Sequence, residues 1–221
     1  MADRKALCLT SDGLAEIGVG DRLILPGDPD FDLHPASKQY VDRRFSHGLV
    51  TGEEVYSRAD LTSTGVTSVS QSMRLVYFTA KKSFITTQVR VLGGTTAAAA
   101  TPTLIENGLF EIDGVGNGAR VAVTGNDTSL YSTASGTYTR LWLSALYAMV
   151  IGQRYALSWL TVSSFAVPTL TGMVLASAAT TEASLPARIT GTISNQTATP
   201  TSFLATSVAV ISARPYGVIL P

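Results

Sequence analysis

Apolar positions beyond residue 73 fall into short runs that have the spacing of β-strands. The runs are rich in Val, Ile, Thr, Tyr and Trp, and turn residues such as Gly, Ser and Asn separate them. No run in this region shows a convincing helical period. Roughly eight short strands of this kind are typical of an antiparallel β-sandwich, here expected to be jelly-roll-like. The runs cover residues 74–79, 84–92, 104–112, 119–124, 137–147, 153–162, 187–193 and 207–211.

Two runs carry the clearest pattern of faces. The run 84–92 alternates, which predicts that four of its side chains share one face: Ile85, Thr87, Val89 and Val91. The run 153–162 has apolar side chains on both faces. Tyr155, Leu157 and Trp159 form one face, while Leu160 and Val162 lie on the other. We therefore expect 153–162 to be buried on one side and at least half covered on the other.

Two further segments give specific local expectations. Glu106-Asn107-Gly108 lies between two apolar segments, Leu104-Ile105 and Leu109–Ile112. An Asn-Gly pair in that setting predicts a β-hairpin turn. The segment Tyr216–Pro221 closes with four apolar residues, which would be unusual on a free tail. We expect it to pack as a last strand in the sheet or in a subunit interface.

One helix is expected, near residues 35–46. Pro35 stands near its first position, where proline is tolerated, and Gly48 is a plausible end. Val41 and Phe45 are four residues apart and therefore share a narrow apolar face. Because a helix of this length is marginal alone, partner helices would stabilise it, and the pattern does not distinguish two partners from three.

Charge density divides the chain near residue 73. Residues 1–73 contain seven basic and eleven acidic residues, whereas 74–221 contain nine and five. A Ser- and Thr-rich stretch at 61–73 separates the two parts and is typical of a linker. The sequence thus predicts an attachment and oligomerisation segment at 1–60, a linker at 61–73 and a β-sandwich head at 74–221.

Composition excludes several classes of function. Sixteen basic residues balance sixteen acidic ones, so no net charge recruits nucleic acid or an anionic membrane. The single cysteine, Cys8, excludes an internal disulfide and a cysteine zinc site. The apolar stretch Leu141–Ile151 is too short to cross a bilayer. We expect no nucleic-acid partner, no membrane insertion, no metal and no cofactor.

Catalytic groups are scarce. Both histidines, His34 and His47, lie before the predicted head, which excludes a Ser-His-Asp triad within it. Asp28, Asp30 and Asp32 resemble the start of a calcium loop, but Leu33 and Gln39 stand where that loop needs Gly and Glu, so a solvated turn is expected. Glu106, Glu111 and Asp113 would be the carboxylates of a glycoside hydrolase, the least favoured alternative.

The string Asp32–Asp42 resembles a short repeat of tailed-bacteriophage fibre and appendage proteins. Its distinctive core is Lys38-Gln39-Tyr40-Val41-Asp42, and in that family such a string marks a trimeric shaft or an attachment region. A weaker resemblance joins 152–160 and 215–221 to compact jelly-roll heads at fibre ends. The resemblance implies that the oligomerisation residues are Lys38, Gln39, Tyr40, Val41, Asp42 and Phe45. One copy of the string implies a short stalk with a knob.

These observations predict a non-enzymatic structural protein of the bacteriophage virion, assembled in the cytoplasm of a bacterial host. The resemblance implies a homotrimer that contacts other virion proteins through its N-terminal segment. A host-surface glycan or receptor would then meet the head. A capsid decoration or head-fibre protein is the alternative. Four aromatic side chains would stack on sugars if exposed, although core positions are expected: Tyr138, Trp142, Tyr147 and Trp159.

Overall fold

The computed structural model of the chain describes residues 7–10, 13–16, 52–98, 102–143, 146–164, 167–175 and 188–221. The chain divides into two compact units, Met1–Val50 and Thr51–Pro221. In the first unit, β1 (Leu7–Thr10) and β2 (Gly13–Glu16) form an antiparallel pair in which Leu7 lies opposite Glu16.

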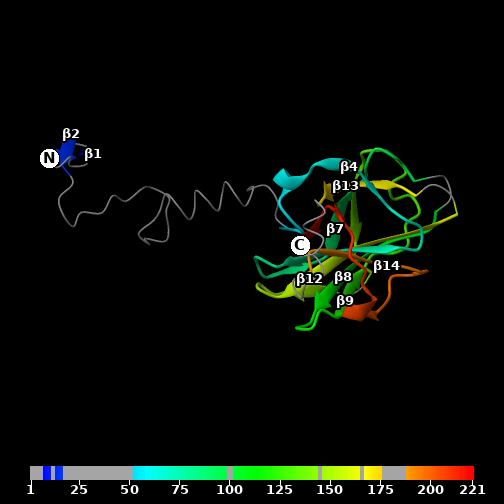
Figure 1. The fold of residues 1–221 in the computed structure, drawn as a ribbon. Helices are drawn as coiled ribbons and strands as arrows, with labels where there is room; N and C mark the ends of the chain where they lie inside the picture. The colour runs from blue at the N-terminus through cyan, green and yellow to red at the C-terminus, as the bar shows by residue number, and fades with distance from the viewer. Residues whose placement is uncertain are drawn as a thin grey trace. The chain divides into compact units, whose positions relative to one another are not determined.

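The second unit consists almost entirely of strands (Figure 1). Among its described residues, the only helical segments are two short 3-10 turns, η1 (Arg58–Asp60) and η2 (Ala205–Ser207). The predicted fold class, mostly β with antiparallel sheets, is confirmed. The strands are β3 (Glu53–Glu54), β4 (Ser63–Thr67), β5 (Met73–Thr79), β6 (Phe84–Thr86), β7 (Gln88–Leu92), β8 (Pro102–Ile112), β9 (Gly118–Val123), β10 (Thr137–Leu141), β11 (Tyr147–Met149), β12 (Arg154–Ser163), β13 (Thr169–Val174), β14 (Thr190–Ile193), β15 (Ser202–Phe203), β16 (Ala213–Pro215) and β17 (Gly217–Leu220).

A six-stranded antiparallel sheet forms the centre of this unit, in the order β14-β5-β12-β8-β9-β15. Strand β12 lies in its middle, with Leu157 opposite Val76 on β5 and Leu109 on β8. All three side chains are fully buried. On the other face, Leu160 of β12 is also buried, so the expectation that this strand is covered on both sides is confirmed.

A four-stranded sheet, β10-β7-β17-β3, packs against one face of the central sheet. Gly217 on β17 marks the contact, because a Cβ there would lie 2.5 Å from Leu157 Cδ2 and 3.0 Å from Trp159 Cζ2. Only glycine permits so close an approach of the two layers. Strand β17 pairs with both β7 and β3, which confirms that the apolar C-terminal segment packs into a sheet.

Strands β14 and β15 are edge strands of the central sheet, and the segment 194–208, which follows β14 and includes β15, folds over the opposite face of that sheet. Phe203 packs on Phe110 with ring centroids 5.1 Å apart, and Val208 lies against Gly191. Burial of both sheet faces explains why β5, β8 and β12 read as nearly continuous apolar runs. The core beneath this segment comprises Met73, Leu75, Tyr77, Phe110, Ile112, Ala156, Leu160, Ile193, Phe203 and Val208.

The predicted hairpin at 106–108 is wrong, because β8 continues through it from Pro102 to Ile112. Asn107 is completely buried, and its Nδ2 donates a hydrogen bond to the Ser158 carbonyl oxygen at 3.1 Å. Its backbone N–H donates to Thr124 Oγ1, and that of Gly108 donates to Ser158 Oγ. These side-chain partners hold an Asn-Gly pair in the sheet interior, where the local turn preference is overridden.

The structural boundary also differs from the one expected near residue 73. The second unit begins at Thr51, so the expected attachment segment 1–60 contributes β3, and the expected linker 61–73 contains β4. Strand pairing explains the difference, since β3 pairs with β17 and β4 with β13. Charge density changes at residue 73, but charge density does not predict which segments pair as strands with the rest of the unit.

The alternation expected over 84–92 is interrupted at Thr87, which separates β6 from β7. Val89 and Val91 are buried as predicted, but Ile85 is 53% exposed and its neighbour Thr86 is fully buried. The break shifts the phase of the alternation by one residue, so β6 turns its apolar side chain outward.

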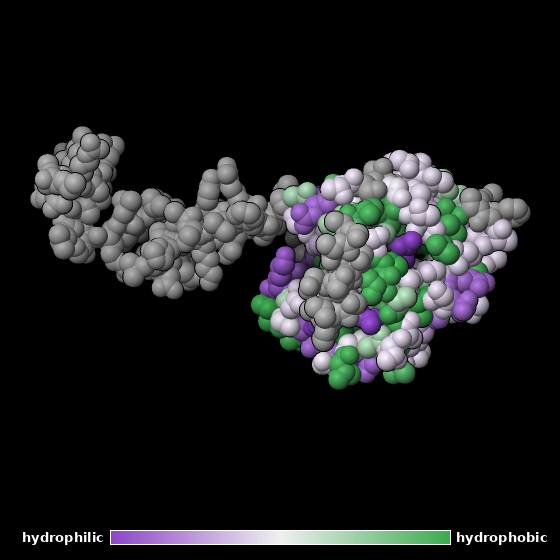
Figure 2. All heavy atoms as spheres, viewed as in Figure 1, coloured by the Kyte–Doolittle hydropathy of each residue, from purple (hydrophilic) through white to green (hydrophobic). Residues whose placement is uncertain are grey.

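Small uncharged residues dominate the visible surface of the second unit. Figure 2 shows mostly pale residues on this face, with groups of green apolar residues among them and fewer purple, strongly hydrophilic ones. This distribution agrees with a charged fraction of only 14% in the whole chain.

Candidate functional site

The residues predicted for oligomerisation lie outside the described residues. This applies to Lys38, Gln39, Tyr40, Val41, Asp42 and Phe45, and to the expected helix 35–46. The acidic group at 28–32 and both histidines also lie outside them. The candidate site built below therefore belongs to the second unit alone.

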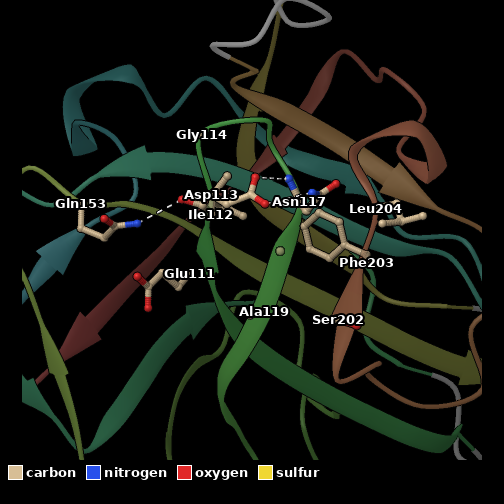
Figure 3. Close-up of a pocket in the computed structure, with 11 residues that line it drawn as sticks. Glu111, Ile112, Asp113, Gly114, Asn117, Ala119, Gln153, Ser202, Phe203 and Leu204 are labelled. Carbon is tan, nitrogen blue, oxygen red and sulfur yellow. Dashed lines mark hydrogen bonds between the residues drawn. The ribbon is translucent and has the colours of Figure 1, made fainter.

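An open cleft of about 700 Å³ lies at one end of the central sheet. The turn between β8 and β9 forms one wall, the start of β12 another, and β15 with Leu204 a third (Figure 3). Its lining combines carboxylate, amide and hydroxyl side chains with four apolar ones, Ile112, Ala119, Phe203 and Leu204. This mixture is found in sites that orient a polar ligand against an apolar surface.

The turn at 113–117 is held by the Asp113 carboxylate. Its Oδ1 accepts hydrogen bonds from the backbone N–H groups of Val115 and Asn117, both at 2.9 Å, and its Oδ2 accepts one from Asn117 Nδ2. The Asn117 side chain, followed by the backbone donors, lowers the pKa of Asp113. Asn117 Oδ1 accepts a bond from the Ala205 N–H at 3.0 Å and so ties the turn to η2.

Two further polar side chains approach the cleft from β8 and β12. Tyr147 Oη donates a 2.7 Å hydrogen bond to Glu111 Oε2, and burial raises the pKa of this tyrosine. Gln153 Nε2 donates to the Ile112 carbonyl oxygen at 3.0 Å (Figure 3). Gln153 Nε2 also donates to the Arg154 carbonyl oxygen at 3.3 Å, so the scaffold orients both Glu111 and Gln153, and both side chains are partly exposed.

The apolar wall consists of Phe203 and Leu204. Phe203 is buried against Gly118, where a Cβ would stand only 2.3 Å from the phenyl ring. Leu204 is 63% exposed and projects beside it. The contact between Gly118 and Phe203 fixes the distance between β9 and β15, and with it the width of the cleft.

The three carboxylates considered for hydrolysis do not form a catalytic pair. Glu106 and Glu111 lie on opposite faces of β8, because they are five positions apart and side chains alternate between the two faces of a strand. Glu106 Oε2 accepts a 2.9 Å hydrogen bond from the Thr199 N–H on one face, while Glu111 meets Tyr147 on the other. Asp113 is engaged by its own turn.

The aromatic side chains divide between core and surface. Trp142 and Trp159 are 7% and 4% exposed, which confirms the expected core role for both. Trp142 Nε1 donates a 2.9 Å hydrogen bond to Thr86 Oγ1. Tyr138 and Tyr147 are half-buried, and Tyr147 is the one of the four that contacts the cleft through Glu111.

Sequence reasoning identified the cleft only in part. Glu111 and Asp113 line the cleft and are among the carboxylates that the sequence offers as catalytic groups. Gln153, Phe203 and Leu204 carried no signal, because the cleft depends on pairing between β9 and β15, more than 80 residues apart in the chain.

The described residues contain no group of three His, Cys, Asp or Glu side chains that could hold a metal ion. Within the same residues, no helix is both long and apolar enough to cross a membrane. No protein-family model matches the chain, and no curated protein matches it either.

Proposed function

We propose that this protein is a non-enzymatic structural subunit of a bacteriophage particle, with an N-terminal attachment and oligomerisation segment and a β head available for host-surface binding. The observation that carries the proposal is the string Asp32–Asp42, which resembles the fibre and appendage repeat. A mostly antiparallel β unit following that string is compatible with a fibre knob. The expected homotrimer and the contacts with other virion proteins belong to this proposal.

The cleft supports a glycan as the ligand of the head. Sugar hydroxyls are bound by planar carboxylate and amide groups, which Glu111, Asn117 and Gln153 supply, while Leu204 offers an apolar surface for a ring face. Since Tyr147 occupies Glu111 Oε2, the other oxygen of that carboxylate is the atom for a ligand hydroxyl.

The same geometry favours binding over cleavage. A glycosidase needs two carboxyl groups on either side of one bond, with the pKa of the acid raised. Here Glu106 and Glu111 lie on opposite faces of β8, and the pKa of Asp113 is lowered by its hydrogen bonds. An aspartate of this kind stays charged and is a poor general acid.

Location on the particle tests the structural half of the proposal. A gold-labelled antibody against the β head, applied to intact particles and viewed by electron microscopy, is expected to mark the tail or its appendages. Label at capsid vertices or capsomer centres would support the capsid decoration alternative. An antibody against the major capsid protein is the control. Particles that bind the control antibody but not the antibody against the β head would refute both alternatives.

Binding to purified host-surface polysaccharide tests the role of the cleft. We expect saturable binding that Glu111→Gln and Gln153→Ala weaken by about tenfold each, as for loss of one oriented hydrogen bond. Gln196→Ala changes an exposed amide outside the cleft and serves as the matched control. Polymer length after incubation should be unchanged, and shortening would favour the enzyme instead.

A further inference from the structure

Exposed apolar side chains of the second unit are concentrated in two parts of the chain, β6 and the stretch 141–151. Among the described residues, more than half of the large apolar side chains that are exposed belong to β6 and to the stretch 141–151. We call this set the apolar surface. It comprises Ile85, Leu141, Leu143, Leu146, Val150 and Ile151.

Backbone pairing brings these side chains together. Strands β6 and β11 are antiparallel, with Ile85 opposite Ala148, and Leu141 at the end of β10 lies opposite Gln88 on β7. Trp142 N–H donates to the Thr87 carbonyl oxygen, which joins β10 to the break between β6 and β7.

The outward direction of the apolar surface follows from the inward partners. Thr86 and Trp142 are buried and share a hydrogen bond, so their neighbours in these extended segments must point the other way. Leu141 and Leu143, on either side of Trp142, are 68% and 73% exposed. The backbone of these segments therefore sets the outward direction of the exposed side chains, whichever rotamer each adopts.

The extent of the surface is that of an interface. Six Leu, Ile and Val side chains, each more than half exposed, present on the order of 700 Å² of apolar area, near the roughly 800 Å² per partner of a stable complex. The largest apolar patch of a typical monomer is smaller, at about 300–600 Å². Water contact over such an area is costly, and a partner would remove it.

Charge and strand edges indicate which partner fits. The stretch 141–153 contains no Asp, Glu, Lys or Arg, so two copies of it can meet without repulsion, whereas a charged partner would gain nothing there. Among the described strands, β11 has β6 as its one hydrogen-bonded neighbour, which makes it an edge strand. Exposed edges of this kind pair readily with another chain.

We propose that the apolar surface binds a second copy of this chain. The proposal goes beyond the proposed function, in which self-association belongs to the N-terminal segment, because it gives the β head a contact of its own. Copies joined by both segments would be held at two places along their length.

Sedimentation velocity on the full chain at micromolar concentration tests the proposal with four proteins. The wild type is compared with Leu143→Asp/Leu146→Asp, with Val41→Asp/Phe45→Asp, and with the combination of all four substitutions. The head variant is expected to raise the dissociation constant of self-association about 30-fold or more. The N-terminal variant should still associate through the head, and the combination should be monomeric.

Controls separate folding from association. Val115→Asp/Val174→Asp introduces the same charges at positions that are also exposed, by 73% and 54%, outside the apolar surface, and should associate like the wild type. Near-ultraviolet circular dichroism, dominated by buried Trp142 and Trp159, checks that each variant is folded. If a head variant loses this signal, the milder Leu143→Ser/Leu146→Ser replaces it.

Three outcomes would overturn the proposal: a monomeric wild type, a head variant that associates normally, or an N-terminal variant that is monomeric although its apolar surface is intact. A monomeric wild type that binds phosphatidylcholine vesicles would identify a lipid surface as the occupant instead. A monomeric wild type would also contradict the homotrimer of the proposed function, whereas a head variant that associates normally would overturn the head contact alone. Location on the particle is tested independently of all three results.

Discussion

Glycine determines how closely neighbouring backbones approach in the second unit. At Gly172 on β13, a Cβ would stand 2.1 Å from the Arg214 carbonyl oxygen, an atom held in place by the pairing of β13 with β16. At Gly114, in the turn beside the cleft, a Cβ would meet nothing within 4 Å. The two positions look alike in the sequence, and only the fold distinguishes them.

Gly172→Ala is therefore expected to lower the free energy of unfolding by about 1–3 kcal/mol or more, because backbone must shift to admit the methyl group. Gly114→Ala is the matched control and should change stability by less than about 0.5 kcal/mol. Urea denaturation followed by tryptophan fluorescence measures both. Equal effects of the two substitutions would contradict the packing at β13 and β16.

Glu53 is a buried carboxylate on β3, only 3% exposed. Burial raises its pKa above 4.5, although the Lys81 N–H bond and the charges of Lys81 and Lys82 oppose the shift. The protonated carboxyl therefore contributes stability that is complete below the unfolded-state pKa and is lost as the pH rises through the folded-state pKa.

Glu53→Gln removes this titration, so its stability relative to wild type should increase as the pH is raised from about 4 to about 7. Chemical denaturation of both proteins at a series of pH values measures the difference. A difference that stays constant over this range would show that the Glu53 pKa is not raised.

At the level of strands, the Thr86 side chain on β6 is hydrogen-bonded to two strands of the neighbouring four-stranded sheet, the end of β10 and β17. Its Oγ1 accepts a hydrogen bond from Trp142 Nε1 at 2.9 Å and donates one to the Leu220 carbonyl oxygen at 2.8 Å. One fully buried hydroxyl thus links β6 to the end of β10 and to β17.

Thr86→Val keeps the shape but leaves the buried Trp142 Nε1–H without its acceptor, while the Leu220 carbonyl oxygen keeps only its bond from the Thr87 N–H. The loss should cost about 1–3 kcal/mol of unfolding free energy. Thr103→Val, at an exposed hydroxyl that donates to the Val162 carbonyl oxygen, should cost much less because water replaces the bond. Thermal unfolding followed by circular dichroism compares them. A neutral Thr86→Val would argue against the buried network.

The strands that were predicted correctly are those in which local pattern and tertiary burial agree. The apolar faces of β12 and the apolar C-terminal strand β17 were expected because their side chains are buried as their hydropathy indicates. The sequence does not predict that β8 is continuous, because Asn107 and Gly108 favour a turn. Hydrogen bonds from these two residues to Ser158 and Thr124 override that preference in the fold. The shift in the alternation of buried and exposed residues at Thr87 is not visible in the residue types of that segment. The cleft residues come together only because strands far apart in the sequence, such as β9 and β15, pair with each other.

At the scale of the whole molecule, the chain divides into two compact units, and the second contains every element of the cleft and the apolar surface. A fragment 51–221 is therefore expected to fold alone with the near-ultraviolet spectrum of the full chain, as buried Trp142 and Trp159 keep their surroundings. A second fragment that begins at residue 61 lacks β3 and the Tyr56 contact with Tyr216, and should be less stable. Loss of the spectrum in the longer fragment would contradict the boundary at Thr51.

The position of β17 between β7 and β3 has a consequence for biosynthesis. Of all the strands in that layer, β17 is made last, and its partner β3 precedes it by more than 160 residues. The layer therefore cannot close before β17 has been made, and pairings so distant in sequence form slowly. Strands β3 and β7 stay unjoined until then, and a stop codon just before β17 would remove the strand that pairs with both of them.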